Sequence, residues 1–385
     1  MTSAATRTTR PLTKSVLEQL RKVREELSLS ARTDDLAETF PAASMEILKK
    51  AGCLKSVLPL AYGGVSAGWH AESVDLLFNL LRTIGGLHLS CARLFEGHVN
   101  AFQLLWTFGN AAQRDSVCRY VSDGGLLGVW NAPSREGELL LCEEEGLGLM
   151  LKGPKAYASG AGGIQRPLVT ARHPQKGLVI VWPDIVYKVG DASEWSMHGM
   201  RASVTRSVKF DGIIKSSHVF GKADDYHSQP QFSGGSWRFL AAQLGAGEAL
   251  VELMRLELVR RGRTTDSHQR ARMAHCVTAL ETGRKWILDT AYLASAKRPS
   301  VEKVIQHANA ARVVVERSLL DVMEIVQRGI GLQLLSRDHP GERILRDLTT
   351  YLRQPAPDAL LEFLGEHAFA KGIATLSGSG DDAEV

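Results

Sequence analysis

The sequence has little cysteine, and its spacing matches neither a disulfide framework nor a C-x-x-C motif. Its five cysteines are scattered, and none belongs to a C-x-x-C pair. An odd, dispersed set is typical of reduced thiols rather than of a disulfide framework, so we predict a cytoplasmic protein. The chain also has no run of 18 apolar residues, which predicts no membrane span. Its first residues have no apolar segment, which argues against a secretory signal.

A strong charge of either sign is also missing. The 46 Lys and Arg residues nearly balance 42 Asp and Glu residues, for a net charge of +4. No basic stripe alternates with aromatic residues, so we predict no nucleic-acid partner. The histidines form neither H-E-x-x-H nor H-x-x-x-H, and we predict no metal site. There is no P-loop and no G-x-S-x-G motif, and "GAGG" at 160–163 does not match a dinucleotide fingerprint.

The residues that are present divide the chain into three structured segments. Helical periodicity dominates residues 1–122, where "ESVDLLFNLLRTIGG" predicts a helix that ends at Gly85 and Gly86. Short runs rich in β-branched residues, split by Gly, Pro, Asn and Asp, predict an antiparallel β domain over residues 123–232. Long Ala-rich amphipathic stretches return over residues 233–372 and predict a four-helix bundle. Residues 373–385 read as a disordered tail. The fold class predicted is α+β, mostly α.

The β segment contains a candidate binding surface. Tyr157 and Ser159, in "KAYASG", are two residues apart, so a regular strand would present them on one face. By the same rule Arg201, Ser203 and Thr205 share a face of the next stretch. A planar heteroaromatic cofactor needs an aromatic ring against it and hydroxyls at its polar edge. The alternative is an exposed sheet face with ordinary polar alternation.

The third segment offers groups for a pyrophosphate. Arg263 lies in "RRGRTTDSHQR", directly after one long helix. The stretch "QRGIG" follows another and contains Gln327, Gly329 and Gly331, where glycine leaves backbone amides accessible. The alternative is a pair of helix C-termini with basic residues that complement the helix dipole.

Four stretches, in order, resemble the acyl-CoA dehydrogenase superfamily of flavoproteins over residues 12–368. "LPLAYGGVSAG" is similar to that family's "P..yGG.g" turn, and "GPKAYASGAG" to its "G.K.wit.g" strand. "MHGMRASVTRSVKFDGIIKSSHVFG" is similar to the run "..G.R.s.t..v.f..v.VP....lG", and "ERILRD" to "eR..RD". The helix, strand, helix order is also that of the family.

The resemblance implies FAD between the β domain and the C-terminal bundle, and a homodimer or homotetramer. By position it places a set of residues at the isoalloxazine ring, namely Trp130, Asn131, Tyr157 and Ser159, with Thr205 on the same surface. It places Arg263 near the pyrophosphate. It places Gln327, Gly329 and Gly331 near the adenine half of a neighbouring subunit's FAD.

The departures from the family concern the catalytic base. A dehydrogenase of the family uses a carboxylate to remove the α-proton, but Pro355 stands at the expected place and Asp358 is the nearest acid. Trp237 or Arg238 stands at the alternative position. One reading is therefore an FAD-dependent oxidoreductase acting on a CH–CH bond, such as that of an acyl thioester, with a displaced base and an electron-transfer partner.

Two other readings stay open. The first is a reduced-flavin-dependent monooxygenase on the same fold, which needs a flavin-reductase partner and in which His98 assists the chemistry. The second is a relative without flavin, because "NAPSREGE" and "QRGIG" keep only part of the family's motifs.

Overall fold

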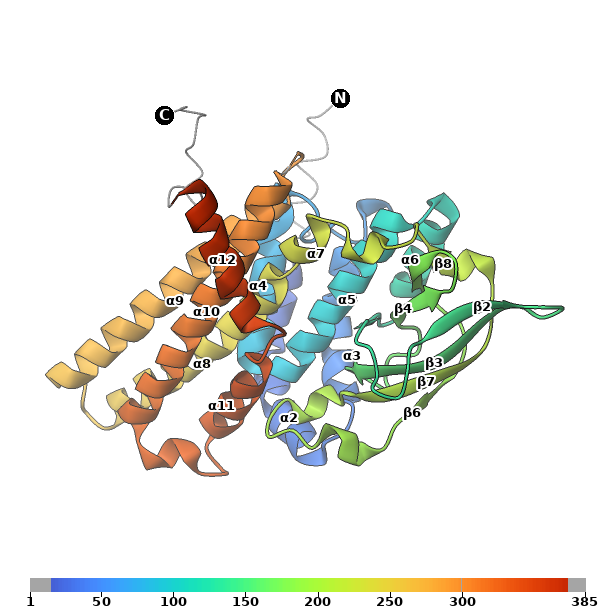
Figure 1. Cartoon of the computed structure of the whole chain (residues 1–385). Helices are drawn as coiled ribbons and strands as arrows, with labels where there is room; N and C mark the ends of the chain where they lie inside the picture. Colours follow the sequence, from blue (N-terminus) through green and yellow to red (C-terminus); the bar gives the residue numbers. More distant parts are fainter. Residues whose placement is uncertain (1–14, 299, 373–385) are drawn as a thin grey trace.

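The computed structural model describes residues 15–298 and 300–372, in which a block of helices lies beside a sheet (Figure 1). Before the sheet come helical residues 15–22, α2 (Arg24–Ala37), α3 (Ala42–Lys50), α4 (Ala71–Leu87), α5 (Leu89–Phe108) and α6 (Ala111–Ser122). After it come α7 (Gln231–Gly234), α8 (Trp237–Arg260), α9 (Ser267–Ala294), α10 (Val301–Ile330), α11 (Pro340–Tyr351) and α12 (Pro357–Lys371). This order confirms the predicted fold class. Among the described helices, none has the length and apolar character needed to cross a bilayer.

The strands form one sheet with the order β6-β7-β3-β2-β4-β5-β8, and β1 pairs with β4. They are β1 (Val129–Trp130), β2 (Leu140–Glu144), β3 (Gly148–Ala158), β4 (Leu168–His173), β5 (Gly177–Val181), β6 (Tyr187–Val189), β7 (Arg206–Ile214) and β8 (Val219–Phe220). The pairings are antiparallel apart from β1–β4 and β2–β4, which are parallel. On β7, Val208 and Phe210 are buried while Lys209 between them is exposed, so one face covers a core and the other meets solvent.

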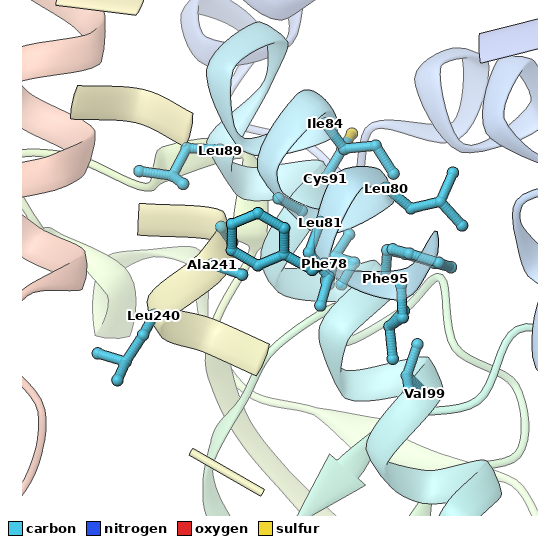
Figure 2. Packing of buried hydrophobic residues seen from close by; sticks show 14 of the residues in the cluster. Phe78, Leu80, Leu81, Ile84, Leu89, Cys91, Phe95, Val99, Leu240 and Ala241 are labelled. Atoms are coloured by element: carbon cyan, nitrogen blue, oxygen red, sulfur yellow. The ribbon is translucent and has the colours of Figure 1, made fainter. Parts of the chain in front are cut away.

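The helices before and after the sheet share one hydrophobic core. Figure 2 shows part of this core, to which Phe78 of α4, Phe95 of α5 and Leu240 of α8 all belong, with Phe78 drawn beside Ala241 of α8. Each such side chain contributes about 1.5–3 kcal/mol when it is fully buried. The sheet has a second core of its own, which includes Trp130 and Phe210. The described helices on either side of the β domain in the sequence therefore form one packed helical unit, and the β domain lies beside it.

Gly85 and Gly86 do not end a helix, as the sequence suggested, because α4 continues to Leu87. A Cβ atom on Gly85 would lie 2.1 Å from the backbone oxygen of Ala242 in α8. A Cβ on Gly245 of α8 would lie 1.9 Å from the backbone oxygen of Arg82. Glycine is needed here because the two helix backbones touch, and not because the chain turns.

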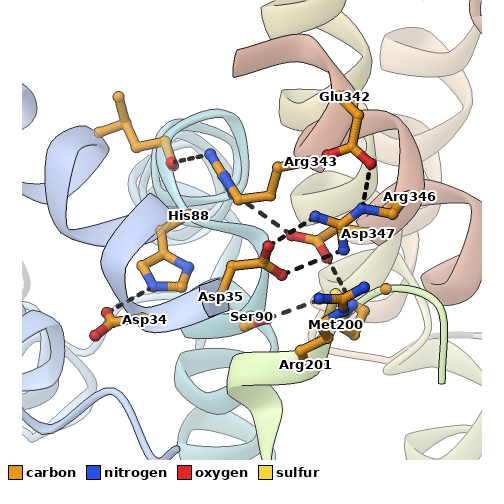
Figure 3. Close-up of polar contacts among 12 residues, drawn as sticks. Asp34, Asp35, His88, Ser90, Met200, Arg201, Glu342, Arg343, Arg346 and Asp347 are labelled. Atoms are coloured by element: carbon orange, nitrogen blue, oxygen red, sulfur yellow. Dashed lines mark hydrogen bonds and ion pairs between the residues drawn. The ribbon is translucent and has the colours of Figure 1, made fainter. Parts of the chain in front are cut away.

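The "ERILRD" segment on α11 joins distant parts of the chain (Figure 3). Arg346 forms an ion pair with Asp35 of α2, with Nη2 2.7 Å from Oδ2. Asp347 accepts a hydrogen bond of 2.6 Å from the backbone N–H of Met200, which lies between the strands β6 and β7. Burial raises the pKa of Asp347 to about 6. These contacts fix α11, and with it Tyr351 at its C-terminal end, against both the N-terminal helices and the β domain.

Candidate active site

The end of β3 departs from a regular strand. The register between β3 and β7 shifts between Lys155 and Ala158, and Tyr157 has a left-handed backbone with φ of 51°. A bulge of this kind breaks the two-residue alternation. Tyr157 is therefore 63% exposed while Ser159 is buried, and the prediction that both lie on one strand face is wrong.

Ser159 belongs instead to a buried chain of hydroxyl groups. Its Oγ lies 3.0 Å from Oγ1 of Thr205, which lies 2.8 Å from Oγ of Ser203. The prediction of a strand from Arg201 to Thr205 is wrong, because residues 201–203 form a 3-10 helix, η4 (Arg201–Ser203), between two left-handed residues. The hydroxyls meet because this turn folds back over the end of β3.

Trp130 lies inside the core of the sheet rather than on an open surface. It is 1% exposed, and its ring meets Tyr187 edge-on with centroids 5.0 Å apart. Its indole Nε1 donates a hydrogen bond of 2.9 Å to the backbone oxygen of Ser159. The indole therefore holds the end of β3, residues 157–159, which we call the β3 exit. The prediction that the Trp130 ring faces a cofactor directly does not agree with this buried placement.

Asn131 is fixed by two neighbours and remains partly accessible. Its side-chain Oδ1 accepts a hydrogen bond of 2.7 Å from the Thr170 hydroxyl, and its backbone oxygen accepts one of 2.9 Å from Lys155 Nζ. Burial lowers the pKa of Lys155 to about 8. Asn131 also lies close enough to Tyr226 to affect the pKa of that phenol.

A second group of polar residues lies where α5, α8, α11 and the short helix η6 (Asp225–His227) converge, and we call it the arginine cluster: Arg93, Glu96, Tyr226, Arg238 and Tyr351. Glu96 accepts from Arg93 Nη1 at 3.1 Å and from Arg238 Nε at 3.4 Å. Burial lowers the pKa of Arg238 and raises that of Tyr226 to about 12. Burial also raises the pKa of Tyr351. The five side chains lie largely in the protein interior, where the low dielectric strengthens the interactions among them.

The chain just after β3 packs against α5, the helix that carries Arg93 and Glu96 of the arginine cluster. A Cβ atom on Gly160, directly after the β3 exit, would lie 3.0 Å from Leu94 of α5, the residue that follows Arg93. Asn131, directly after β1, lies close enough to Tyr226 of the cluster to affect the pKa of its phenol. The site is thus formed by the β domain on one side and by the helices on the other.

A pocket of about 280 Å³ lies beside Arg238. Arg238 lines it together with Asn100 and Gln103, whose side-chain oxygens accept hydrogen bonds of 2.7 Å from its Nη2 and Nη1. Trp69 and Trp237 add aromatic surface to the same walls. The pocket combines apolar lining with a few oriented polar groups, as ligand sites do.

His98 is not in this site but in the helical core, with no exposed surface. Its Nε2 lies 3.0 Å from the backbone oxygen of Leu54, and its Nδ1 accepts a hydrogen bond of 3.1 Å from the backbone N–H of Leu127. Burial lowers the pKa of His98 to about 4. Both ring nitrogens are used by backbone groups, so the expected position at the cleft is wrong.

Asp358 is also away from the arginine cluster. It lies exposed on the first turn of α12, a helix that packs on α10 and has no buried residue (Figure 1). Pro355, just before it, accepts a hydrogen bond of 2.7 Å from Arg312 through its backbone oxygen. The structure therefore does not bring Asp358 to the position of a displaced base.

The residues predicted for a pyrophosphate and an adenine lie at the far end of the bundle from the β3 exit. Arg263 is paired with Asp266 at 2.5 Å, and the Gln327 amide donates to the backbone of its own helix at Met323. A Cβ on Gly329 would lie 2.3 Å from the Met254 sulfur, so this glycine serves the packing of α10 on α8. Gly331 ends α10 with φ of 85°.

Arg93, Glu96 and Tyr351 were not predicted from the sequence, and Arg238 was considered only as a residue at the position of a base. One sequence pattern does indicate part of this cluster. In "ARLFEGHVN" the polar residues Arg93, Glu96 and Asn100 recur at intervals of three and four within an otherwise apolar helix. A polar stripe on a buried helix face indicates a functional or paired set of charges.

No family model and no curated protein matches the chain by sequence. Solved structures match by fold. The FMN-bound TdsC from Paenibacillus sp. A11-2 is 17% identical, with a TM-score of 0.80 over 95% of this chain and 100% of that one. The methanesulfinate monooxygenase MsuC from Pseudomonas fluorescens is 21% identical, with a TM-score of 0.79 over 94% and 99%. A nitrososynthase from Micromonospora carbonacea var. africana is 19% identical, with a TM-score of 0.80 over 94% and 97%.

These likenesses confirm the predicted fold, in which helices precede and follow a middle β domain. Within the described ranges, no group of three or more His, Cys, Asp or Glu side chains could hold a metal ion.

Proposed function

We propose that the chain is a flavin-dependent oxidoreductase that inserts oxygen into a small-molecule substrate, with reduced flavin supplied by a separate reductase. The nearly complete overlap with TdsC, which binds FMN, and with the monooxygenase MsuC supports this choice within the fold. A bound reduced flavin would supply two electrons to O₂, so that one oxygen atom enters the substrate and the other leaves as water. The chain itself has to bind the ring, place the substrate and exclude water.

The β3 exit fits one edge of a flavin ring. Tyr157 offers an exposed aromatic surface, and Gly162 leaves open space where a side chain would stand. On the neighbouring strand β7, Arg206 pairs with Ala158, and its Nε is buried with no hydrogen-bond partner among the described residues. A buried, unpaired donor one strand away from an exposed aromatic side chain suits the polar edge of a heteroaromatic cofactor. Tyr157, Arg206 and the hydroxyls of Ser159 and Thr205 would hold it.

The observation that favours oxygenation over dehydrogenation is the state of the only carboxylate in the arginine cluster. Glu96 is engaged by Arg93 at 3.1 Å and by Arg238 at 3.4 Å. A carboxylate bonded by two guanidinium groups has little capacity to remove a proton from carbon. Asp358 is exposed on another helix. Removal of an α-proton from an acyl thioester therefore has no candidate base in the cluster.

The kind of flavin is a separate part of the proposal. FAD is the cofactor that the sequence resemblance implies. Its pyrophosphate would require Arg263, and the adenine half of a neighbouring subunit's FAD would require Gln327, Gly329 and Gly331, all at the end of the bundle. Arg263 is paired with Asp266 there. FMN needs none of these residues. We propose that the site binds the isoalloxazine ring and the ribityl phosphate of the flavin, and that it needs no adenylate half.

An anaerobic experiment separates the two reactions. The purified chain is loaded with FMN or FAD, desalted, and mixed with octanoyl-CoA without oxygen. The proposal predicts no bleaching of the flavin absorbance, because no base is present to start the reaction. Bleaching within the time of a turnover would establish a dehydrogenase and overturn the proposal.

A second arm tests oxygenation directly. The chain is incubated with NADH, a separate flavin reductase and ¹⁸O₂, and with indole and methanesulfinate as probes, since these are named for two proteins of the same fold. The proposal predicts one labelled oxygen atom in the product of a probe that binds. The matched control omits the chain, because free reduced flavin also reacts with oxygen.

A further inference from the structure

We propose that the arginine cluster binds the oxyanion of the substrate, and that the substrate is therefore a small organic carboxylate or sulfinate. This inference rests on the proposed function, because it assigns the substrate class of the same site. It depends on three features of the cluster: its net charge, the unused donors of Arg93, and a buried hydroxyl without a partner.

The cluster has one more positive than negative charge. It contains the two guanidinium groups of Arg93 and Arg238 and the single carboxylate of Glu96. The Arg238 side chain is 8% exposed and the Glu96 side chain 7%, so solvent screens these charges little. An unbalanced charge in such a place is costly unless an anion compensates it.

The two arginines differ in how many of their donors are used. Arg238 bonds to Glu96, Gln103 and Asn100 through its three nitrogens. Arg93 bonds only to Glu96, through Nη1, and makes no other hydrogen bond or ion pair with the described residues. Its side chain is 27% exposed, whereas Glu96 is buried. Nε and Nη2 of Arg93 are thus left for a group that arrives from outside, and an oxyanion matches that fork.

Tyr351 supplies a third donor. It is 7% exposed, and its hydroxyl is buried without a hydrogen-bond partner among the described residues. It lies close enough to Arg93 to affect the pKa of that side chain electrostatically, as does Tyr226. A buried phenol that donates to an anion would satisfy the missing hydrogen bond. The anion would then lie near Asn131, which is close to Tyr226 at the edge of the β domain.

The test is a titration of the flavin-loaded chain with benzoate and with its neutral counterpart benzamide, followed by calorimetry. We expect benzoate to bind at least 10-fold more tightly than benzamide. The variant Arg93→Met should lose this preference. Arg119→Met is the control, because Arg119 is an exposed residue of α6 paired with Asp115, and removing it changes the net charge equally. It should keep the preference.

Glu96→Gln guards against a loss of binding that comes only from misfolding. It raises the charge of the cluster by one, so it should tighten benzoate binding several-fold and leave benzamide unchanged, which a folding defect would not do. A wild-type chain without the preference, or an Arg93→Met chain that keeps it, overturns the inference. Methanesulfinate, titrated in the same way, distinguishes a sulfinate from a carboxylate site.

The flavin content of every sample separates this inference from the proposed function. A chain that retains flavin but ignores the charge of the probe overturns only the substrate class. A chain that binds no flavin overturns the proposed function, and the titration of that flavin-free chain still decides whether the cluster is an anion site.

Discussion

Arg346, near the end of the chain, forms a two-point ion pair with Asp35, near its start. Nη2 lies 2.7 Å from Oδ2 and Nη1 lies 3.3 Å from Oδ1, and both side chains are less than 10% exposed. Arg346 also bonds Glu342 and the backbone oxygen of His198 in the β domain. Burial lowers the pKa of Arg346, but these partners raise it above its usual value overall. This pair fastens the first helices, the last helices and the sheet at one point.

Asp35→Ala should therefore destabilise the chain by about 3 kcal/mol, because removing one partner of a buried pair leaves its charge poorly compensated. Asp338→Ala provides the matched control. It removes the exposed pair of Asp338 with Arg32 and should cost about 0–1 kcal/mol. Urea unfolding followed by circular dichroism measures both. Equal losses would show that the Arg346 pair does not hold the three parts together.

Tyr157→Ala should weaken flavin binding by about 3- to 10-fold, which corresponds to the loss of one aromatic contact. Its effect on unfolding should be small, since the side chain is mostly exposed. The control is Ile213→Ala, which removes an exposed apolar side chain from β7 of the same sheet. The measurement is the flavin retained after desalting. If Tyr157→Ala retains as much flavin as Ile213→Ala, the β3 exit is not the ring site.

Arg263→Ala tests the FAD reading. If Arg263 contacts a pyrophosphate, the variant should bind FAD less well while FMN binding stays unchanged, because FMN lacks the adenylate half. Arg260→Ala, at an exposed residue one turn earlier, is the control. Affinities for both flavins come from fluorescence quenching. An equal effect on FAD and FMN would remove Arg263 from the cofactor site.

We expect the folded chain to lose stability in acid because of His98. Its Nδ1 accepts from Leu127, so a proton added there would face another N–H group. Its pKa is lowered from 6.5 to about 4, so between these pH values the unfolded chain binds the proton that the folded chain does not. Stability is therefore complete above pH 6.5 and is lost as the pH falls toward 4. The full effect is about 3 kcal/mol.

Comparison with His98→Gln isolates this contribution. Unfolding free energies of both chains are measured between pH 7 and pH 4. The variant is expected to be less stable at pH 7 and to lose about 3 kcal/mol less than the wild type over this range. Parallel curves would mean that His98 does not titrate differently in the folded chain.

The sequence predicted the order of helices and strands because that order depends on local periodicity. It failed where a local pattern is overruled by contacts from elsewhere. Alternation placed Tyr157 and Ser159 on one face, but the bulge opposite β7 separates them. Gly85 was interpreted as a helix end, but glycine is needed there because the backbone of α8 leaves no room for a Cβ atom.

The site was predicted less well than the fold. The places of Tyr157 and Asn131 at a flavin ring stay predictions. His98 has the residue type of a catalytic group, but the backbone of Leu54 and of Leu127 uses both its nitrogens. The link between Glu96 and Arg238 joins residues 142 positions apart, which no local spacing indicates.

The most direct test of the account is the absorbance spectrum of the purified chain, recorded after incubation with FMN or FAD and passage through a desalting column. The account predicts flavin bands that remain with the protein and that decrease in Tyr157→Ala. A colourless chain with either flavin would contradict the proposed function. The fold would then serve a ligand other than flavin, and the enzymatic assignment would have to be withdrawn.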